Sequence, residues 1–464
     1  MSMKQLIFYT FAYNAQATLR RTIDSVLGQT RADWVWHLLD NGSTDSTGEI
    51  IREAARQDGR IIALANKENH VWEPGNGWWD IAWKYDENDY LCVIDADDEY
   101  KPEFAEKMLD FIAKHDLEIA ACGFDFIDAQ TKQAYAKRVQ TTSLIIEGGG
   151  FSEHFAEYHK YMRTMWGKLY LISVLRKYDY SRASKTLYYG GDTQFAIESY
   201  RNASRIGILN ESLHRYFLYP KSTSRTWDNW RVESDVILDD MAREFLIDKC
   251  GEVSQKNDEF LLIVYFNALS DTLKVLLSSQ IPPGEMISAL RGIFLSEKTR
   301  RLTAWSGFAE QKKELYGCAE QLLLLLLNEA GQELAKDATE IIKAMHPNHE
   351  HPLLDGISPG LADLIPATVC YIISGRYGQA LERFLADTEG AEIDDSDAEA
   401  YILLGFNLAA AAENPDVYIY FRKVWISFLL DSSRCNEAKD ELCQLEQLLP
   451  GDGELAELRE RLIN

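Results

Sequence analysis

Features that would point to a secreted or membrane-spanning protein are scarce in this 464-residue chain. There are only seven cysteines, an odd number, and no two of them form a C-x-x-C pair. Small secreted domains depend on paired cysteines, so this count favours free buried thiols in a reducing compartment. Apolar runs such as Leu322–Leu327 are far shorter than the roughly 20 residues that cross a bilayer. We therefore expect no transmembrane segment.

A charged N-terminal region followed by an apolar run and a cleavage site is also missing, so we expect no signal peptide. Basic residues are few as well: 48 Lys and Arg stand against 73 Asp and Glu, for a net charge of -25. This excess of acidic residues disfavours nucleic acid as a partner, and it disfavours electrostatic docking on anionic lipid. The sequence therefore predicts a cytoplasmic protein whose contact with the inner membrane face is at most peripheral.

The charge that is present divides the chain into two halves. Residues 1–232 carry a net charge of -4, whereas residues 233–464 carry -21. The length and the hydrophobic content of 46% suffice for two or three domains. We expect an α/β domain over residues 1–232, an α-helical domain over 233–350 and a repeat-like helical region over 351–464.

In the first half, strand patterns alternate with helix patterns. Apolar runs predict strands at Leu6–Phe11, Trp34–Leu39, Arg60–Ala65, Tyr90–Ile94 and Ile119–Phe126. Helical spacing predicts helices at Ala15–Gln29, Thr47–Gln57 and Pro102–His115. This βαβ order predicts a mostly parallel sheet with helices on both faces. Ligands of such sheets bind beyond the carboxyl ends of the strands.

After about Trp230 the strand-like runs stop, and long amphipathic stretches predict helices. From Leu361 onward, helix pairs with small residues resemble tetratricopeptide repeats, in which small residues let two helices pack closely. The period is irregular, and an unrelated helical bundle is the alternative. Binding of an acceptor or a partner would suit such a region, and a role in forming a homodimer remains open.

The four residues Asp95-Ala96-Asp97-Asp98 offer three carboxylates directly after an apolar strand. A hard divalent cation binds one or two carboxylates together with substrate phosphates, and a strand end holds such side chains on a rigid edge. Taken alone, this D-x-D-D cluster is more often a solvated acidic turn.

Other motifs follow strands in the same order. They are Tyr13-Asn14-Ala15, Asp40-Asn41-Gly42-Ser43-Thr44-Asp45, Trp166-Gly167-Lys168, Gly191-Asp192-Thr193 and Ser222-Thr223-Ser224. Together with the D-x-D-D cluster they resemble glycosyltransferase family 2 over about residues 4–228. The resemblance implies a GT-A nucleotide-sugar-binding domain, followed here by an all-α, repeat-like domain.

The resemblance implies a donor site. Asp40 resembles the acid that accepts a hydrogen bond from the nucleobase, and Thr10 and Tyr13 lie where the family holds the base. Asp95 resembles the acid near the ribose and the metal, and Lys168 lies at the diphosphate edge. The donor is then a nucleotide-diphosphate sugar. Family habit favours a UDP-sugar, with dTDP- and GDP-sugars left open.

The resemblance also implies a metal and a base. Asp97 resembles the direct ligand of a divalent cation, Mn2+ or Mg2+, with Asp98 as a weaker ligand. Asp192 resembles the catalytic base, and Trp166 lies on the acceptor side. A cation would stabilise the charge of the leaving diphosphate, and a carboxylate would deprotonate the incoming hydroxyl. Direct displacement would invert the anomeric centre.

Several positions depart from the family pattern. Gly167 stands where the family has Asn, and Gly191 where it has an acid before the base. Phe217 and Tyr219 replace an Arg and a His, so a third metal ligand is open. His214 is a substitute by proximity only.

The implied function is an inverting glycosyltransferase of bacterial surface glycan or glycoprotein synthesis, with a glycan, a lipid-linked or a protein acceptor. The alternative is a catalytically weak scaffold whose helical half recruits partners.

Overall fold

The computed structural model describes residues 4–69, 75–179, 189–219, 226–330, 334–346 and 351–463. The motif Ser222-Thr223-Ser224 lies outside these residues. The chain forms two compact units, residues 1–268 and 269–464, and the division falls within helix α10 (Gln255–Leu277). The expected division into three segments stays a prediction.

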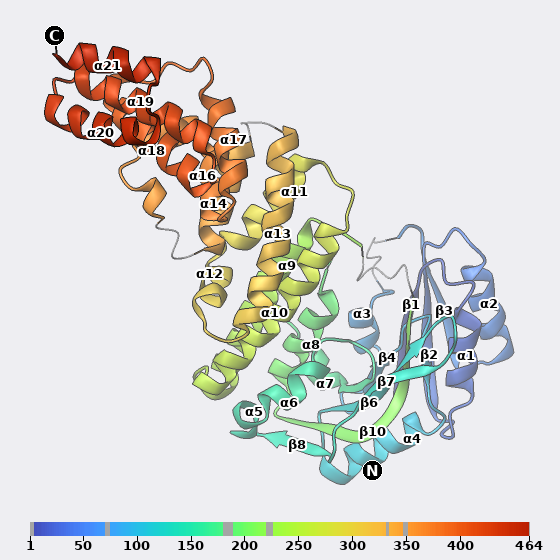
Figure 1. Ribbon diagram of the computed structural model, residues 1–464. Coiled ribbons are helices and arrows are strands. Elements are labelled where there is room, and N and C mark those ends of the chain that lie inside the picture. Colours follow the sequence, from blue (N-terminus) through green and yellow to red (C-terminus); the bar gives the residue numbers. More distant parts are fainter. Residues whose placement is uncertain are drawn as a thin grey trace. The chain divides into compact units, whose positions relative to one another are not determined.

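Unit 1 is built on one mixed sheet (Figure 1). Across the sheet the strands are β3 (Ile61–Asn66), β2 (Trp34–Asn41), β1 (Leu6–Ala12), β4 (Tyr90–Val93), β9 (Lys168–Leu171), β6 (Ile119–Asp128), β10 (Arg205–Leu218) and β5 (Glu99–Tyr100). β7 (Ala134–Arg138) pairs with β6, and β8 (Leu144–Glu147) pairs with β10. The first four strands are parallel to one another, and so are β6 and β10. β9 joins these two groups through antiparallel pairs.

Helices cover both faces of the sheet, as the sequence predicts. Alternate residues of β1 are buried in two hydrophobic cores. Ile7 and Tyr9 belong to the first core, and Leu6 and Phe8 belong to the second. The second core is completed by α1 (Leu19–Leu27), α2 (Thr47–Gln57) and α4 (Phe104–His115). The first core is completed by α3 (Trp78–Ala82), α5 (Gly150–Glu153), α6 (Phe155–Tyr158), α7 (Ile172–Leu175), α8 (Gly191–Asn202) and α9 (Trp230–Cys250).

Helix α9 and the start of α10 belong to the sheet unit. Phe245, Leu246 and Leu261 are buried in the same core as Ile7. Of the described helices, α10 is the one long and apolar enough to cross a membrane by length and composition, and 44% of its apolar window is buried inside the protein. A core helix shows the same composition, so the expected absence of a transmembrane segment stays a prediction.

In the described part of unit 2 every regular element is a helix. These are α11 (Pro283–Phe294), α12 (Glu297–Ala304), α13 (Ala309–Ala330), α14 (Ala335–Met345), η4 (Pro352–Leu354), α15 (Pro359–Leu364), α16 (Pro366–Ile373), α17 (Tyr377–Thr388), α18 (Asp395–Ala411), α19 (Pro415–Asp431), α20 (Cys435–Leu448) and α21 (Gly453–Ile463).

Three helix ends of unit 2 share one turn. Gly375, Glu413 and Ser433 are left-handed, and in each turn the next residue donates its N–H to a carbonyl five residues earlier. This hydrogen bond closes the last helical turn, and the next helix begins one residue later. The repeated turn agrees with the repeat-like texture, although tetratricopeptide repeats as such stay a prediction.

Candidate active site

The backbone of the turn after β4 is fixed by side chains of β1 and α1 and of the loop that joins them. Four of them donate hydrogen bonds to its carbonyl oxygens: Thr10 to Ile94 (2.7 Å), Thr18 to Ala96 (3.0 Å), Thr22 to Asp98 (2.8 Å) and Arg21 to Asp97. The Thr10 hydroxyl also accepts a hydrogen bond from Trp36 at 3.2 Å. Thr10 is buried, and its hydroxyl therefore holds the turn rather than facing a nucleobase.

Asp98 differs from the other two acids of this turn. Its side chain is buried, and its two oxygens are 2.7 Å from Nε2 of His214 and 2.9 Å from the donating N–H of Phe217. Burial lowers the pKa of His214 to about 3, so the ring is neutral. Asp98 thus ties the D-x-D-D turn to β10, and both of its oxygens are already engaged.

Asp95 and Asp97 have no such partners. They are half-buried, and among the described residues no other residue donates a hydrogen bond to either carboxylate. Burial raises the pKa of both, and the charges of Asp192, Asp98 and Asp97 raise that of Asp95 further. Two carboxylates without partners at the carboxyl end of a strand form an anionic site that a cation would stabilise.

No group of three or more His, Cys, Asp or Glu that could hold a metal ion occurs in the ranges that the structure describes. A Mg2+ ion held partly by substrate phosphates requires only one or two carboxylates from the protein. Asp95 and Asp97 fit that requirement, whereas Asp98 would first have to release His214 and Phe217.

Asp192 lies in the first turn of helix α8 and next to the acids of the turn after β4. Gly190, the residue before the helix, has φ +87°, and a Cβ there would come within 2.6 Å of Leu238. Only glycine fits this entry into the helix. Burial raises the pKa of Asp192, and its charge in turn raises that of Asp95. The predicted base and the predicted donor-side acid are therefore neighbours.

Trp166 and Lys168 have mainly structural contacts. The indole of Trp166 stacks on His214 (4.3 Å between centroids) and Tyr216 (5.1 Å). The Lys168 ammonium donates to both oxygens of Thr164 (2.7 and 2.8 Å) and to the carbonyl of Trp166 (3.0 Å). Burial lowers the pKa of Lys168 to about 7. Its three donors are occupied, so it holds the loop before β9 rather than reaching a diphosphate.

The glycine between them explains one departure from the family. Gly167 has φ +68°, a conformation that Gly and Asn adopt at low cost and other residues do not. Trp-Gly-Lys and the family's Trp-Asn-Lys therefore meet the same backbone requirement.

The loops after β1 and β2 form the predicted nucleobase end. The Asn14 side chain accepts from the N–H of Thr44 at 2.9 Å, and Ser43 accepts from the N–H of Asn14 at 3.0 Å. Asp40 is half-buried and accepts from the N–H of Ser43 at 3.0 Å, and the ring of Tyr13 is 45% exposed. These contacts tie the two loops together, and the exposed Tyr13 ring is left for stacking.

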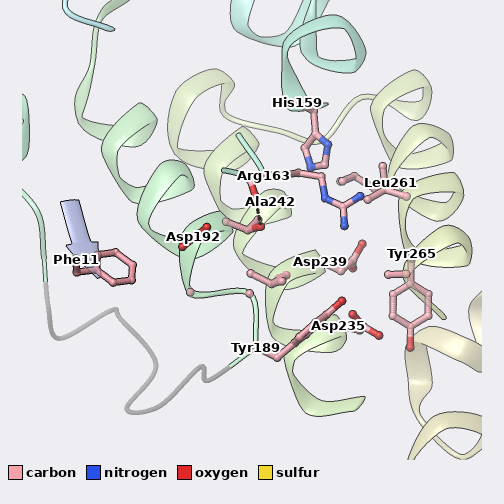
Figure 2. A pocket seen from close by; sticks show the side chains of 16 residues that line it. Phe11, His159, Arg163, Tyr189, Asp192, Asp235, Asp239, Ala242, Leu261 and Tyr265 are labelled. Atoms are coloured by element: carbon pink, nitrogen blue, oxygen red, sulfur yellow. Dashed lines mark hydrogen bonds between the residues drawn. The ribbon is translucent and has the colours of Figure 1, made fainter. Parts of the chain in front are cut away.

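A cavity of about 560 Å³ opens beside Asp192 (Figure 2). It is lined by Phe11, His159, Arg163, Tyr189, Gly190, Gly191, Asp192, Thr193, Asp235, Leu238, Asp239, Ala242, Leu261, Val264, Tyr265 and Ala268. One wall is formed by α9 and α10. The cavity wall therefore includes helices that lie beyond the α/β segment expected from the sequence.

Sequence reasoning missed Arg21. Its guanidinium binds the carbonyl of Asp97 and the hydroxyl of Tyr219 (3.1 Å), pairs with Glu99 (3.1 Å) and stacks on Phe217 (3.6 Å). The sequence signal for Arg21 is that Phe217 and Tyr219 stand where the family has Arg and His. Arg21 from α1 contacts both residues and supplies a cation at this place.

Residues 8–177 match the family model described as Glycosyl transferase family 2. The match covers the D-x-D-D turn and Trp166-Gly167-Lys168, is shorter than half of the chain and ends before Asp192. Over this segment unit 1 is similar to glycosyl transferases of family 2, and its sheet with helices on both faces is the GT-A fold expected from the sequence.

Two relatives are similar to the first half. The uncharacterized glycosyltransferase EpsJ of Bacillus subtilis (strain 168) is 23% identical over 45% of this chain and 60% of its own length. The uncharacterized glycosyltransferase YibD of Escherichia coli (strain K12) is 23% identical over 46% and 61%. The chain thus spans less than two thirds of either relative. A crystal structure of S. aureus TarS with UDP-GlcNAc is 13% identical at a TM-score of 0.40, covering 81% of this chain and 93% of that one.

Proposed function

We propose that this chain is a glycosyltransferase that moves a sugar from a nucleotide-diphosphate sugar to a hydroxyl acceptor in the synthesis of a bacterial surface glycan or glycoprotein. The observation that carries the proposal is the convergence of Asp95, Asp97 and Asp192 beyond the carboxyl end of β4, next to a cavity. The similarity to family 2 over residues 8–177 supports it.

The donor would lie across the carboxyl ends of β1, β2 and β4. Asp40 and the exposed ring of Tyr13 would hold the nucleobase at one end, with a UDP-sugar as our preferred donor. Asp95 and Asp97 would face the diphosphate through a divalent cation that, when bound, offsets the negative charge of the leaving group. Asp98 and Lys168 keep positioning roles in this proposal, because their polar atoms are already engaged.

Asp192 would accept the proton of the acceptor hydroxyl. Burial raises its pKa, which makes the carboxylate a stronger base than a solvated aspartate. The cavity beside it would give an acceptor access to this base. If Asp192 only removes the proton and forms no bond to the sugar, one displacement takes place and the anomeric centre inverts.

The test is donor hydrolysis by the full chain over a panel of nucleotide sugars, with Mn2+, Mg2+ or EDTA, reading the nucleoside diphosphate released. We expect release from one nucleotide class, dependent on the divalent cation and lost in Asp97→Asn. A chain that binds none of the donors and releases no nucleotide contradicts the proposal and favours the scaffold.

A further inference from the structure

The cavity beside Asp192 is large enough for more than a bare hydroxyl. Its volume of about 560 Å³ is within the range of small-molecule sites, and its wall combines charged, aromatic and apolar side chains. Because Asp192 is part of the wall, a ligand in the cavity can bring a hydroxyl to this base. The chemistry of the remaining wall therefore selects the acceptor.

Arg163 is the cation of this wall. Its side chain is exposed and points into the cavity (Figure 2). Within the described residues no carboxylate lies within 4 Å of its guanidinium, although the chain as a whole has far more acids than bases.

Two carboxylates of α9 also line the cavity. Asp239 pairs with Arg243 at 2.7 Å on its own helix. Asp235 lies one turn earlier on the same helix. Asp239 therefore has another cation, and Arg163 is available to a ligand.

Arg138 lies close to Arg163, and Lys160 lies close to Arg138. The Arg138 guanidinium donates to the carbonyl of Lys160 at 3.4 Å, and the charge of Arg163, after burial, lowers the pKa of Arg138. Arg138 lies near the ring of Phe124 (5.3 Å) and Lys160 near that of Tyr161 (5.6 Å). Burial lowers the pKa of Lys160, and the charge of Glu157 raises it. The charges of Arg138 and Arg163 repel each other, and an anion bound at Arg163 would reduce that repulsion.

We propose, building on the glycosyltransferase function proposed above, that this cavity takes an anionic acceptor: a glycan whose phosphate or carboxylate is bound by Arg163, with Arg138 and Lys160 adding positive charge nearby. Arg163 would bind the anion through paired N–H donors, the geometry in which guanidinium recognises phosphate and carboxylate.

The test uses three compounds that share the pyranose ring and differ at C6: neutral methyl glucoside, methyl glucuronide with a carboxylate, and methyl glucoside 6-phosphate. Their dissociation constants for the full chain are measured by ligand-observed NMR at low salt. We expect at least one anionic glucoside to bind about tenfold more tightly than the neutral one, since a charge-assisted hydrogen bond contributes on this scale. The carboxylate and phosphate arms show which anion is preferred.

Arg163→Glu should abolish the preference, and Arg163→Lys should keep part of it because the charge remains. Lys114→Glu, a matched charge reversal at an exposed position of α4, should leave the preference unchanged. Circular dichroism confirms that each variant is folded. Anionic glucosides that bind no more tightly than methyl glucoside, or do not bind at all, overturn the inference, and so does a preference that survives in Arg163→Glu.

Donor hydrolysis by the same preparation separates this outcome from the fate of the proposed function. Hydrolysis without an anion preference overturns the anionic acceptor alone. An anion preference without hydrolysis supports the anion site and contradicts the glycosyltransferase function.

Discussion

The two units balance their charges in different ways. In unit 2, cations lie in ion pairs near the surface, such as Lys423 with Asp452 (2.8 Å) and Arg461 with Asp431 (2.7 Å). In unit 1, Asp95 and Asp97 are half-buried without a partner among the described residues. Most of the net charge is in the second half of the chain, yet the site lies in the first. The number of acids therefore does not locate a site, whereas buried charge that lacks a partner does.

The same contrast exists between neighbours in one turn. Asp97 and Asp98 are adjacent in the sequence, but Asp98 is buried and hydrogen-bonded, whereas no other described residue donates a hydrogen bond to the Asp97 carboxylate. A carboxylate with satisfied oxygens stabilises the fold, and a carboxylate without them is available for a ligand. Mutation of the first kind of carboxylate should lower stability, whereas mutation of the second kind should lower activity.

The largest effect, a loss of folding, should come from truncating the chain at the start of α9. A fragment of residues 1–232 removes α9 and α10, whose Phe245, Leu246 and Leu261 belong to the core under β1. We expect it to aggregate or to remain unfolded, since several large apolar side chains would lose their core contacts. A fragment of residues 1–277 keeps both helices and should stay folded, as judged by circular dichroism and gel filtration.

Nucleotide binding by the longer fragment then shows whether unit 1 is sufficient for the donor. If the 1–232 fragment is as stable as the 1–277 fragment, α9 and α10 are dispensable for the sheet unit. The assignment of these helices to unit 1 would then be wrong.

The next effect is on turnover. Asp192→Asn removes the proposed proton acceptor and should lower transfer by about 10²- to 10⁴-fold, the usual contribution of a general base. Nucleotide affinity should change little, because donor binding does not need that proton. Isothermal titration and initial rates measure the two quantities. An equal loss of affinity and turnover would make Asp192 a donor-binding residue.

The neighbouring acids give a matched pair of smaller effects. Asp97→Asn should lose donor hydrolysis and keep or raise the melting temperature, because it removes an unpaired buried charge. Asp98→Ala leaves His214 and the N–H of Phe217 unsatisfied and should destabilise the fold by about 1–3 kcal/mol for each group. Thermal unfolding and hydrolysis are measured on both. A stability loss in Asp97→Asn with little loss in Asp98→Ala would reverse the assignment.

The sequence predicted five strands and three helices within residues 6–126 and the turn after β4, because local apolar runs set both. It did not separate Asp97 from Asp98, since that difference depends on His214 and Phe217, more than 110 residues further along the chain. The sequence also placed the domain boundary near residue 232, and the cavity wall formed by α9 and α10 follows from a helix packing that no motif encodes. Hydrogen bonds to residues distant in the sequence, rather than residue type, decide which of the predicted residues have polar atoms available to a ligand.

The smallest effect we expect is a pH-dependent response to Mn2+. The folded-state pKa of Asp95, Asp97 and Asp192 is raised above the ordinary value of 3.8. Between that value and the raised values the folded chain binds more protons than the unfolded chain, so stability without metal falls as the pH rises through this window.

A divalent cation requires the ionised carboxylates. Mn2+ should therefore raise the melting temperature by a few degrees above the raised pKa values and by less at acidic pH, where protons compete for the same oxygens. Differential scanning fluorimetry at pH 5 and pH 8, with and without Mn2+, measures this. Asp97→Asn should remove most of the shift at pH 8, whereas Lys114→Glu should retain it. An equal shift at both pH values, or one that survives in Asp97→Asn, would mean that Mn2+ binds elsewhere and that the unpaired acids of unit 1 are not its ligands.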